Sequence, residues 1–223
     1  MVEIALSSRN WGSAKRQVMT LARRAIDNRE ELGAAMVDAA EATIRRDGGA
    51  ALTARGLAKQ LGVSVGTVYN VHGSMDELVE KVNARTLARL EAEIADIDAG
   101  QGGVEDVLLE FARRYMAYVQ ANLNLWSVLF EGQLNDAAGV NQVRIDRLFG
   151  ILERALEPVE ADAAMRVKSA RVLWASVHGI LQMDFTGRLK LLKIDDVEAA
   201  IRHAVRCHLA GMAAISGKQD LSP

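Results

Sequence analysis

The sequence predicts an all-α protein, in which an N-terminal three-helix domain with a helix-turn-helix precedes a C-terminal helical bundle. Its 223 residues are half hydrophobic and a quarter charged, the composition of a globular protein that buries a substantial core. Only two prolines occur, and this scarcity favours long helices over many short strands. Apolar residues recur at helical spacing along most of the chain, and no segment shows the alternation of a convincing strand.

The first 28 residues form a basic extension. They hold five arginines and lysines against two acidic residues, which gives a net charge of +3. After a candidate cap at Ser13, apolar residues recur at helical spacing, so the extension is predicted to be either a short extra helix or a mobile arm. A helix is then expected from about residue 28 to Asp47, where Gly48 and Gly49 end it.

Two short helices are predicted next, at residues 54–61 and 65–71. Each follows a hydroxyl residue, Thr53 or Ser64, that is suited to cap its N-terminus. A long helix is expected from Ser74 to about residue 99. Its start is indicated by acidic residues in the first turn, which match the helix dipole.

The order of residues from Ala58 to Val68 is typical of a helix-turn-helix, within a predicted domain at residues 29–90. Ala58 is small where the two helices cross, Gly62 permits the left-handed backbone of the tight turn, and Val68 packs the second helix on the first. The same residues would serve a structural hairpin in any helical bundle. The pattern therefore favours DNA binding and leaves that alternative open.

The second domain is predicted at residues 104–223, after a linker at residues 99–103 that is rich in glycine. The net charge is +3 for residues 1–90 and −5 for the remainder, so only the front of the chain favours a polyanion. Within the second domain, helices are expected at about residues 104–121, 122–133, 140–156, 160–186 and 195–215.

Residues 32–78 resemble the N-terminal DNA-binding domain of the TetR family of bacterial transcriptional regulators. The sequence departs from the family at His72, where an aromatic residue is usual, and at Met75, where a lysine usually contacts a phosphate. Arg23 and Arg24 of the basic extension are candidates to replace that contact. The similar residues are Leu52-Thr53, Gly62-Val63-Ser64-Val65-Gly66-Thr67-Val68-Tyr69 and Gly73-Ser74-Met75-Asp76-Glu77-Leu78.

The resemblance and the chemistry of the residues together select a set of DNA contacts. Hydroxyls and backbone N–H groups at helix N-termini bind phosphates, and Tyr69 has the reach to do so. Val65 is expected to pack on a thymine methyl, and Gly66 to bring the helix backbone close to the groove. Asn70 either reads adenine or solvates the helix end. The predicted DNA-binding residues are Thr53, Arg55, Ser64, Val65, Gly66, Thr67, Tyr69, Asn70 and Ser74.

Residues 174–179, Trp-Ala-Ser-Val-His-Gly, resemble the Trp…His-Gly signature of one TetR C-terminal subgroup. The resemblance implies a homodimer formed through the last two long helices, with Gly179 allowing another helix to approach closely. A dimer would place two recognition helices one DNA turn apart, as a palindromic operator in double-stranded DNA requires.

Aromatic side chains of the second domain are candidates for the lining of an effector pocket, although most are expected in the core. His178 is expected to be buried at a helix interface rather than to contact a ligand or act as a base. The predicted pocket residues are Phe111, Tyr115, Tyr118, Trp126, Phe130, Trp174 and His178.

No metal site, cofactor or catalytic site is predicted. His203 and Cys207 share a helical face beside His208, but no carboxylate or second cysteine completes a site, so packing is the favoured interpretation. Phosphate loops and nucleophile motifs are absent, which excludes a recognisable enzyme. No apolar run approaches the ~20 residues of a membrane span, and the single cysteine fits a reducing compartment, so a cytoplasmic protein is expected.

The predicted function is a TetR-like regulator, a repressor that binds a palindromic operator as a homodimer and is released by a small apolar effector. The alternative is a helical small-molecule-binding or enzymatic protein whose N-terminal hairpin is only structural. Salt-dependent, sequence-preferring binding to duplex DNA separates the two.

Overall fold

The computed structural model describes the backbone of residues 8–98, 102–131 and 140–219, and the side chains of residues 28–98, 102–130 and 141–215. Within these ranges the regular elements are helices, and no strand occurs, as the sequence predicts. The chain divides into two compact units, residues 1–82 and 83–223. The domain bounds drawn from the sequence stay predictions.

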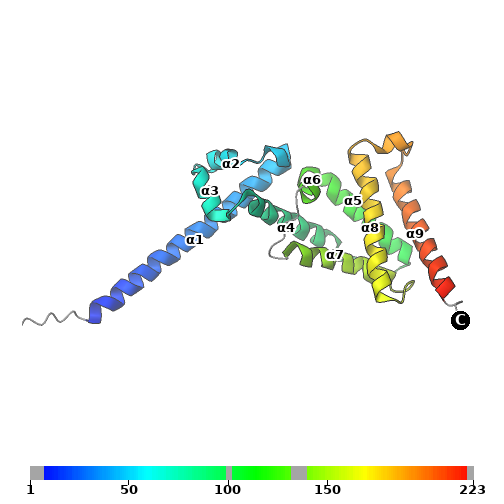
Figure 1. Cartoon of the computed structure of the whole chain (residues 1–223), viewed down its shortest axis with the longest axis horizontal. Coiled ribbons are helices and arrows are strands. Elements are labelled where there is room, and N and C mark those ends of the chain that lie inside the picture. Colours follow the sequence, from blue (N-terminus) through cyan, green and yellow to red (C-terminus); the bar gives the residue numbers. More distant parts are fainter. Residues whose placement is uncertain (1–7, 99–101, 132–139, 220–223) are drawn as a thin grey trace, which may run out of the picture. The chain divides into compact units, whose positions relative to one another are not determined.

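The first unit begins with one long helix, α1 (Ser8–Asp47). The expected helix start near residue 28 is wrong, because α1 continues through that position without a break (Figure 1). The sequence there contains no proline or glycine that would end a helix. A short 3₁₀ turn, η1 (Gly49–Ala51), follows α1 after the predicted glycine stop.

Helices α2 (Ala54–Leu61) and α3 (Val65–His72) lie beside α1 and contact each other. Their predicted caps are confirmed: Gly56 N donates to Thr53 Oγ1 at 3.1 Å, and Thr67 N donates to Ser64 Oγ at 3.0 Å. The turn between them passes through Gly62 at φ 68°, a left-handed conformation that glycine adopts without strain. The first unit therefore contains a helix-turn-helix.

Helix α4 (Met75–Ile94) begins directly after Ser74, whose Oγ accepts a hydrogen bond from Glu77 N at 3.0 Å. It ends about five residues before the predicted end at residue 99. The boundary between the two units falls inside this helix, after Val82. Residues of one continuous helix thus belong to both units.

The second unit contains five further α-helices in its described part. Helix α5 matches its predicted range, and α8 and α9 begin two to three residues later than expected because Asp162 and Asp196 cap them. A 3₁₀ turn before α9 was not predicted. The bounds are α5 (Val104–Ala121), α6 (Leu123–Glu131), α7 (Val140–Leu156), α8 (Ala163–Phe185), η2 (Leu189–Leu192) and α9 (Val197–Gln219).

The core of the second unit forms where α5, α7, α8 and α9 pack together (Figure 1). The predicted stripe of Leu108, Phe111, Tyr115 and Tyr118 is buried on α5, and Trp126 of α6 joins it. Among the described residues, no helix combines the length and the hydropathy that a membrane span needs.

Gly179 on α8 is exposed, and no other described residue covers it. A Cβ atom built on Gly179 would meet no described atom within 4 Å, and the same holds for Gly211 on α9. Val172, about two turns before Gly179, is half exposed. The glycine at 179 therefore has no packing reason within the described part of this chain.

Candidate DNA interface and ligand cavity

The exposed face of α3 carries two large apolar side chains. Val65 and Tyr69 are 38% and 44% exposed, and they lie four residues apart, so they share one face of the helix. Val68 points the other way and is buried. A helix that hides one face and leaves an apolar residue and a tyrosine in solvent on the other is suited to contact another molecule.

Three hydroxyl residues stand at the N-termini of α2, α3 and α4. Thr53, Ser64 and Ser74 each accept a hydrogen bond from a backbone N–H of the following turn. A hydroxyl that accepts in this way still has its own proton to donate. The cap role therefore leaves each residue able to donate to a phosphate oxygen.

The predicted DNA-binding residues lie on the surface of the helix-turn-helix. Seven are exposed, and Thr67 and Ser74 are half-buried. The Thr67 hydroxyl is paired with Ser64 Oγ at 2.8 Å. The exposed members are Thr53, Arg55, Ser64, Val65, Gly66, Tyr69 and Asn70.

His72, the first departure from the family pattern, is a buried residue at the end of α3. Its side chain is 3% exposed, and its Nε2 lies 3.2 Å from the carbonyl oxygen of Gly33 on α1. Its Nδ1 lies 3.0 Å from Lys81 Nζ on α4. Burial lowers the pKa of His72, and the charge of Lys81 lowers it further. The imidazole thus connects α3 to its two neighbouring helices.

A second contact holds the same end of α3. The Arg29 guanidinium on α1 donates to the carbonyl oxygen of Asn70. A positive charge at a helix C-terminus is favourable because of the helix dipole.

Sequence reasoning missed Arg29, Gly33 and Lys81, because none of them lies in the motif. Met75, the second departure, is half-buried, and the side chains of Arg23 and Arg24 lie outside the described residues.

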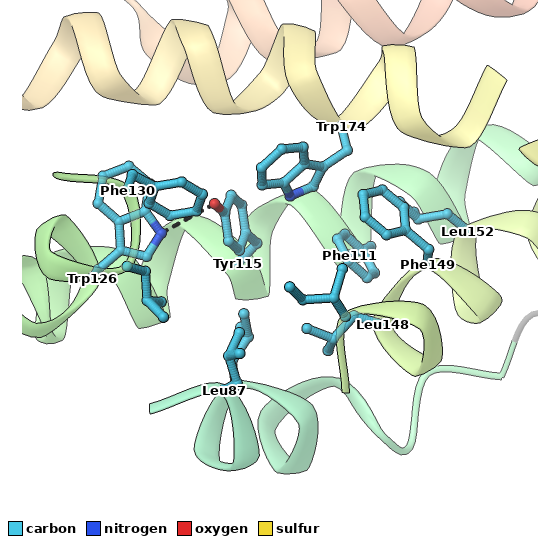
Figure 2. A pocket seen from close by; sticks show the side chains of 12 residues that line it. Leu87, Phe111, Tyr115, Trp126, Phe130, Leu148, Phe149, Leu152 and Trp174 are labelled. Carbon is cyan, nitrogen blue, oxygen red and sulfur yellow. Dashed lines mark hydrogen bonds between the residues drawn. The ribbon is translucent and has the colours of Figure 1, made fainter. Parts of the chain in front are cut away.

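A cavity of about 260 Å³ lies within the second unit (Figure 2). Helices α4, α5, α6, α7 and α8 all contribute to it, and the labelled side chains point toward a common space. Five of the predicted pocket residues line it: Phe111, Tyr115, Trp126, Phe130 and Trp174.

The other two predicted pocket residues do not line the cavity. Tyr118 is buried, and its hydroxyl donates to the carbonyl oxygen of Thr86 at 2.7 Å. His178 contacts a lining residue without lining the cavity itself, because its Nδ1 lies 3.0 Å from the hydroxyl of Tyr115. Sequence reasoning missed seven lining residues, because an apolar residue at helical spacing looks the same in a core and beside a cavity: Leu87, Leu90, Leu129, Ile145, Leu148, Phe149 and Leu152.

The polar groups of Tyr115, Trp126 and His178 form one hydrogen-bonded chain at the cavity. Trp126 Nε1 donates to the Tyr115 hydroxyl at 3.1 Å, and that hydroxyl also contacts His178. Burial raises the pKa of Tyr115 well above its usual range, and burial lowers the pKa of His178. Both groups are therefore neutral near pH 7.

Three aromatic rings surround the imidazole of His178. The ring centroids of Trp126, Phe130 and Trp174 lie 4.9, 4.5 and 4.6 Å from its own. Phe130 is also 46% exposed, so it borders both the cavity and the solvent. The aromatic end of the cavity is thus built as one packed cluster from α5, α6 and α8 (Figure 2).

The described residues offer no metal centre. Cys207 Sγ lies 3.4 Å from His203 Nε2 on the exposed face of α9. His208 is half-buried on another side, where burial lowers its pKa. No group of three ligating side chains gathers anywhere in the described part of the chain.

Two family models match the chain. One, described as bacterial regulatory proteins of the tetR family, matches residues 36–82. The other, described as tetracyclin repressor-like, C-terminal domain, matches residues 108–208. Together they match well over half of the chain, including α3 and most of the cavity lining. No similar sequence is found among curated proteins.

Several solved structures share the fold. A tetR-family transcriptional regulator from Streptomyces coelicolor is 18% identical with a TM-score of 0.61, and the match covers 85% of this chain and 83% of that one. A protein with unknown function from Rhodococcus sp. RHA1 is 20% identical with a TM-score of 0.63, covering 82% and 95%. The TetR family transcriptional regulator PfmR from Thermus thermophilus is 18% identical with a TM-score of 0.52, covering 78% and 97%.

Proposed function

The chain belongs to the TetR family of bacterial transcriptional regulators, and we propose that it is a repressor that binds a palindromic operator as a homodimer and is released by a small apolar effector. The observation that carries the proposal is the exposed face of α3, with Val65 and Tyr69 in solvent beside three hydroxyl caps. Because such a regulator must reach the chromosome, we also propose that it acts in the cytoplasm.

DNA reading is divided among the residues of the helix-turn-helix. The hydroxyls of Thr53, Ser64 and Ser74 and the phenol of Tyr69 contact phosphates, which sets the register on the duplex. Val65 packs on a thymine methyl in the major groove. The remaining predicted contacts are Arg55, Gly66, Thr67 and Asn70.

Dimerisation through α8 and α9 is supported by the small residues that these helices leave uncovered. Gly179 and Gly211 have open space where a side chain would stand. Close packing of two helices favours glycine, because the backbones can then approach. A partner subunit would supply the missing packing, and its own α3 would read the second half of the palindrome.

The cavity is the proposed effector site, and α4 is the proposed link to the DNA-binding unit. Leu87 and Leu90 of α4 line the cavity, and Lys81, fewer than two turns earlier on the same helix, contacts His72 at the end of α3. A ligand that favours one position of α4 changes the population of DNA-binding conformations.

The alternative is a helical small-molecule-binding protein or enzyme whose helix-turn-helix is only structural. The test is selection of bound fragments from the organism's own genomic DNA, repeated with Tyr69→Ala. We expect a palindromic sequence to be enriched, with affinity that falls steeply as salt rises. Failure to enrich any sequence, with equal recovery by Tyr69→Ala, would support the alternative.

A further inference from the structure

We propose that the cavity of the second unit takes an uncharged, flat aromatic molecule of about two fused rings and rejects carboxylates, phosphates and ammonium groups. This ligand class rests on the proposed effector function and makes it more specific. Three features of the lining carry the inference: its lack of charge, its small number of free hydrogen-bonding groups and its aromatic walls.

The first feature is the absence of charge. None of the twelve lining residues is ionisable except Tyr115, whose phenol is held neutral. An ion moved from water into such a site loses its hydration and gains no counter-charge, which is strongly unfavourable. A ligand that carries a charge at neutral pH is therefore excluded, unless the charge stays outside the cavity.

The second feature is that two of the three polar side-chain groups of the lining, those of Tyr115 and Trp126, bond to each other. The Tyr115 hydroxyl accepts from Trp126 Nε1 and contacts His178 Nδ1. Among the described residues, the buried side-chain atoms without a partner belong to Asn83, Asn141, Arg144 and His208, and none of these residues lines the cavity. Apart from the indole N–H of Trp174, the side chains of the lining therefore offer no free polar group that could bond to a hydroxyl or an amide.

The third feature is the shape of the walls. Half of the lining residues are aromatic, and in Figure 2 Trp126 and Phe130 stand at one end of the space and Phe149 at the other, with Tyr115 and Trp174 between them. Aromatic rings prefer offset or edge-on contact with other rings, a preference that a saturated ring does not satisfy. The volume of about 260 Å³ is small for a ligand site, which favours two rings over a long chain.

The test compares three probes of similar size at pH 7: naphthalene, 2-naphthoate and decalin. Binding is measured by equilibrium dialysis with the full chain and no DNA. We expect naphthalene to bind at least about tenfold more tightly than decalin, and 2-naphthoate to show no saturable binding. Binding of 2-naphthoate as tight as that of naphthalene would overturn the exclusion of charge. Equal binding of decalin would overturn the aromatic preference.

A pair of substitutions on α7 locates the probe. Leu148→Trp fills the cavity and should abolish naphthalene binding, whereas Val143→Trp, at a 52% exposed position of the same helix, should leave it unchanged. Circular dichroism checks the fold, and Leu152→Phe is the milder filling variant if Leu148→Trp does not fold. If naphthalene binds both filled variants as tightly as it binds the parent, its site lies outside the cavity, and this result would overturn the proposal.

The effector role is tested separately by measuring operator affinity with each probe. Naphthalene that binds but leaves operator affinity unchanged would support the ligand class and contradict release from DNA. If naphthalene releases the parent and Val143→Trp from the operator but does not release Leu148→Trp, the result would support both the ligand class and the effector role.

Discussion

Lys81 Nζ donates a hydrogen bond to His72 Nδ1 across 3.0 Å, and this contact fixes the protonation of the buried ring. An ammonium group has only protons to offer, so Nδ1 must be the acceptor. The ring proton then resides on Nε2, which donates to the carbonyl oxygen of Gly33 at 3.2 Å. A protonated His72 would direct an N–H at the ammonium of Lys81, so the native contact requires the neutral imidazole.

This contact predicts that the protein loses stability as the pH falls below about 6.5. The pKa of His72 is lower in the folded state than in the unfolded state, so the unfolded chain binds the proton first. The stabilisation is complete above the unfolded pKa and decreases as the pH falls from there toward the lowered folded pKa. Burial lowers the pKa values of His178 and His208 as well, so they contribute with the same sign.

His72→Phe isolates the contribution of His72, since it keeps a ring at the position and removes the titrating group. Urea unfolding of both proteins at pH 7.5 and 5.5 measures the effect. The free energy of unfolding should fall less with pH in the variant than in the parent. An equal fall in both proteins would assign the pH dependence to His178, His208 or the carboxylates.

Tyr69→Ala should weaken specific operator binding by about 1–3 kcal/mol, because one phosphate contact and its packing are lost. The fold and the dimer should persist, since the side chain is 44% exposed and packs little within the chain. Leu123→Ala, at a similarly exposed position of α6, is the control and should bind operator like the parent. Parent-like affinity of Tyr69→Ala would remove Tyr69 from the interface.

Val65→Ser and Val65→Lys should each change the preferred base at one position of each half-site. A valine discriminates through contact with a thymine methyl, whereas serine and lysine present hydrogen-bond donors to base edges. Selection from a randomised operator library reads the preference directly. The same base profile in both variants and the parent would mean that Val65 does not read sequence.

Gly179→Leu should weaken dimerisation, because the new side chain would enter a space that the partner's helix is proposed to fill. Within one chain the substitution is tolerated, as no described atom lies within 4 Å of the added Cβ. Gly179→Ala, which adds one methyl group, is the graded control. Sedimentation at micromolar concentration measures the association, and a fully dimeric Gly179→Leu protein would place the interface on another surface.

Deleting the basic extension, residues 1–28, should reduce operator affinity with little effect on the ranking of sites. The deleted segment carries a net charge of +3 and no evident base-reading pattern. If it neutralises about two or three phosphates, the slope of log K against log salt should flatten by roughly 2–3 units. An unchanged slope would make the extension purely structural, and an altered ranking of sites would mean that it contacts bases.

Local chemistry explains which elements the sequence could predict. The bounds of α2 and the caps at Thr53 and Ser64 follow from hydroxyl residues that act within one helical turn. The N-terminal end of α1 was missed because no breaker marks it. The role of His72 was missed for another reason: its partner Gly33 lies 39 residues away in the chain.

The two candidate sites also differ in how far the sequence could predict them. Motif spacing alone predicts α3 as the recognition helix, because the DNA contacts of a helix-turn-helix are held in one short segment. The cavity depends on packing between five helices, so aromatic composition found Trp126 and Trp174 but could not separate Leu148, which lines the space, from Tyr118, which lies in the core. Such a distinction requires the packed structure.

Cys207 gives the proposed dimer a built-in position for a spectroscopic label. It is the single cysteine of the sequence, and its side chain is exposed on α9. A nitroxide can therefore be attached at one position per chain without removing other thiols, one turn from Gly211 of the proposed interface, and sedimentation checks that the labelled protein still dimerises. Pulsed electron paramagnetic resonance would then yield one distance between the two α9 helices. The change in that distance on adding naphthalene would record motion between subunits before any operator is present.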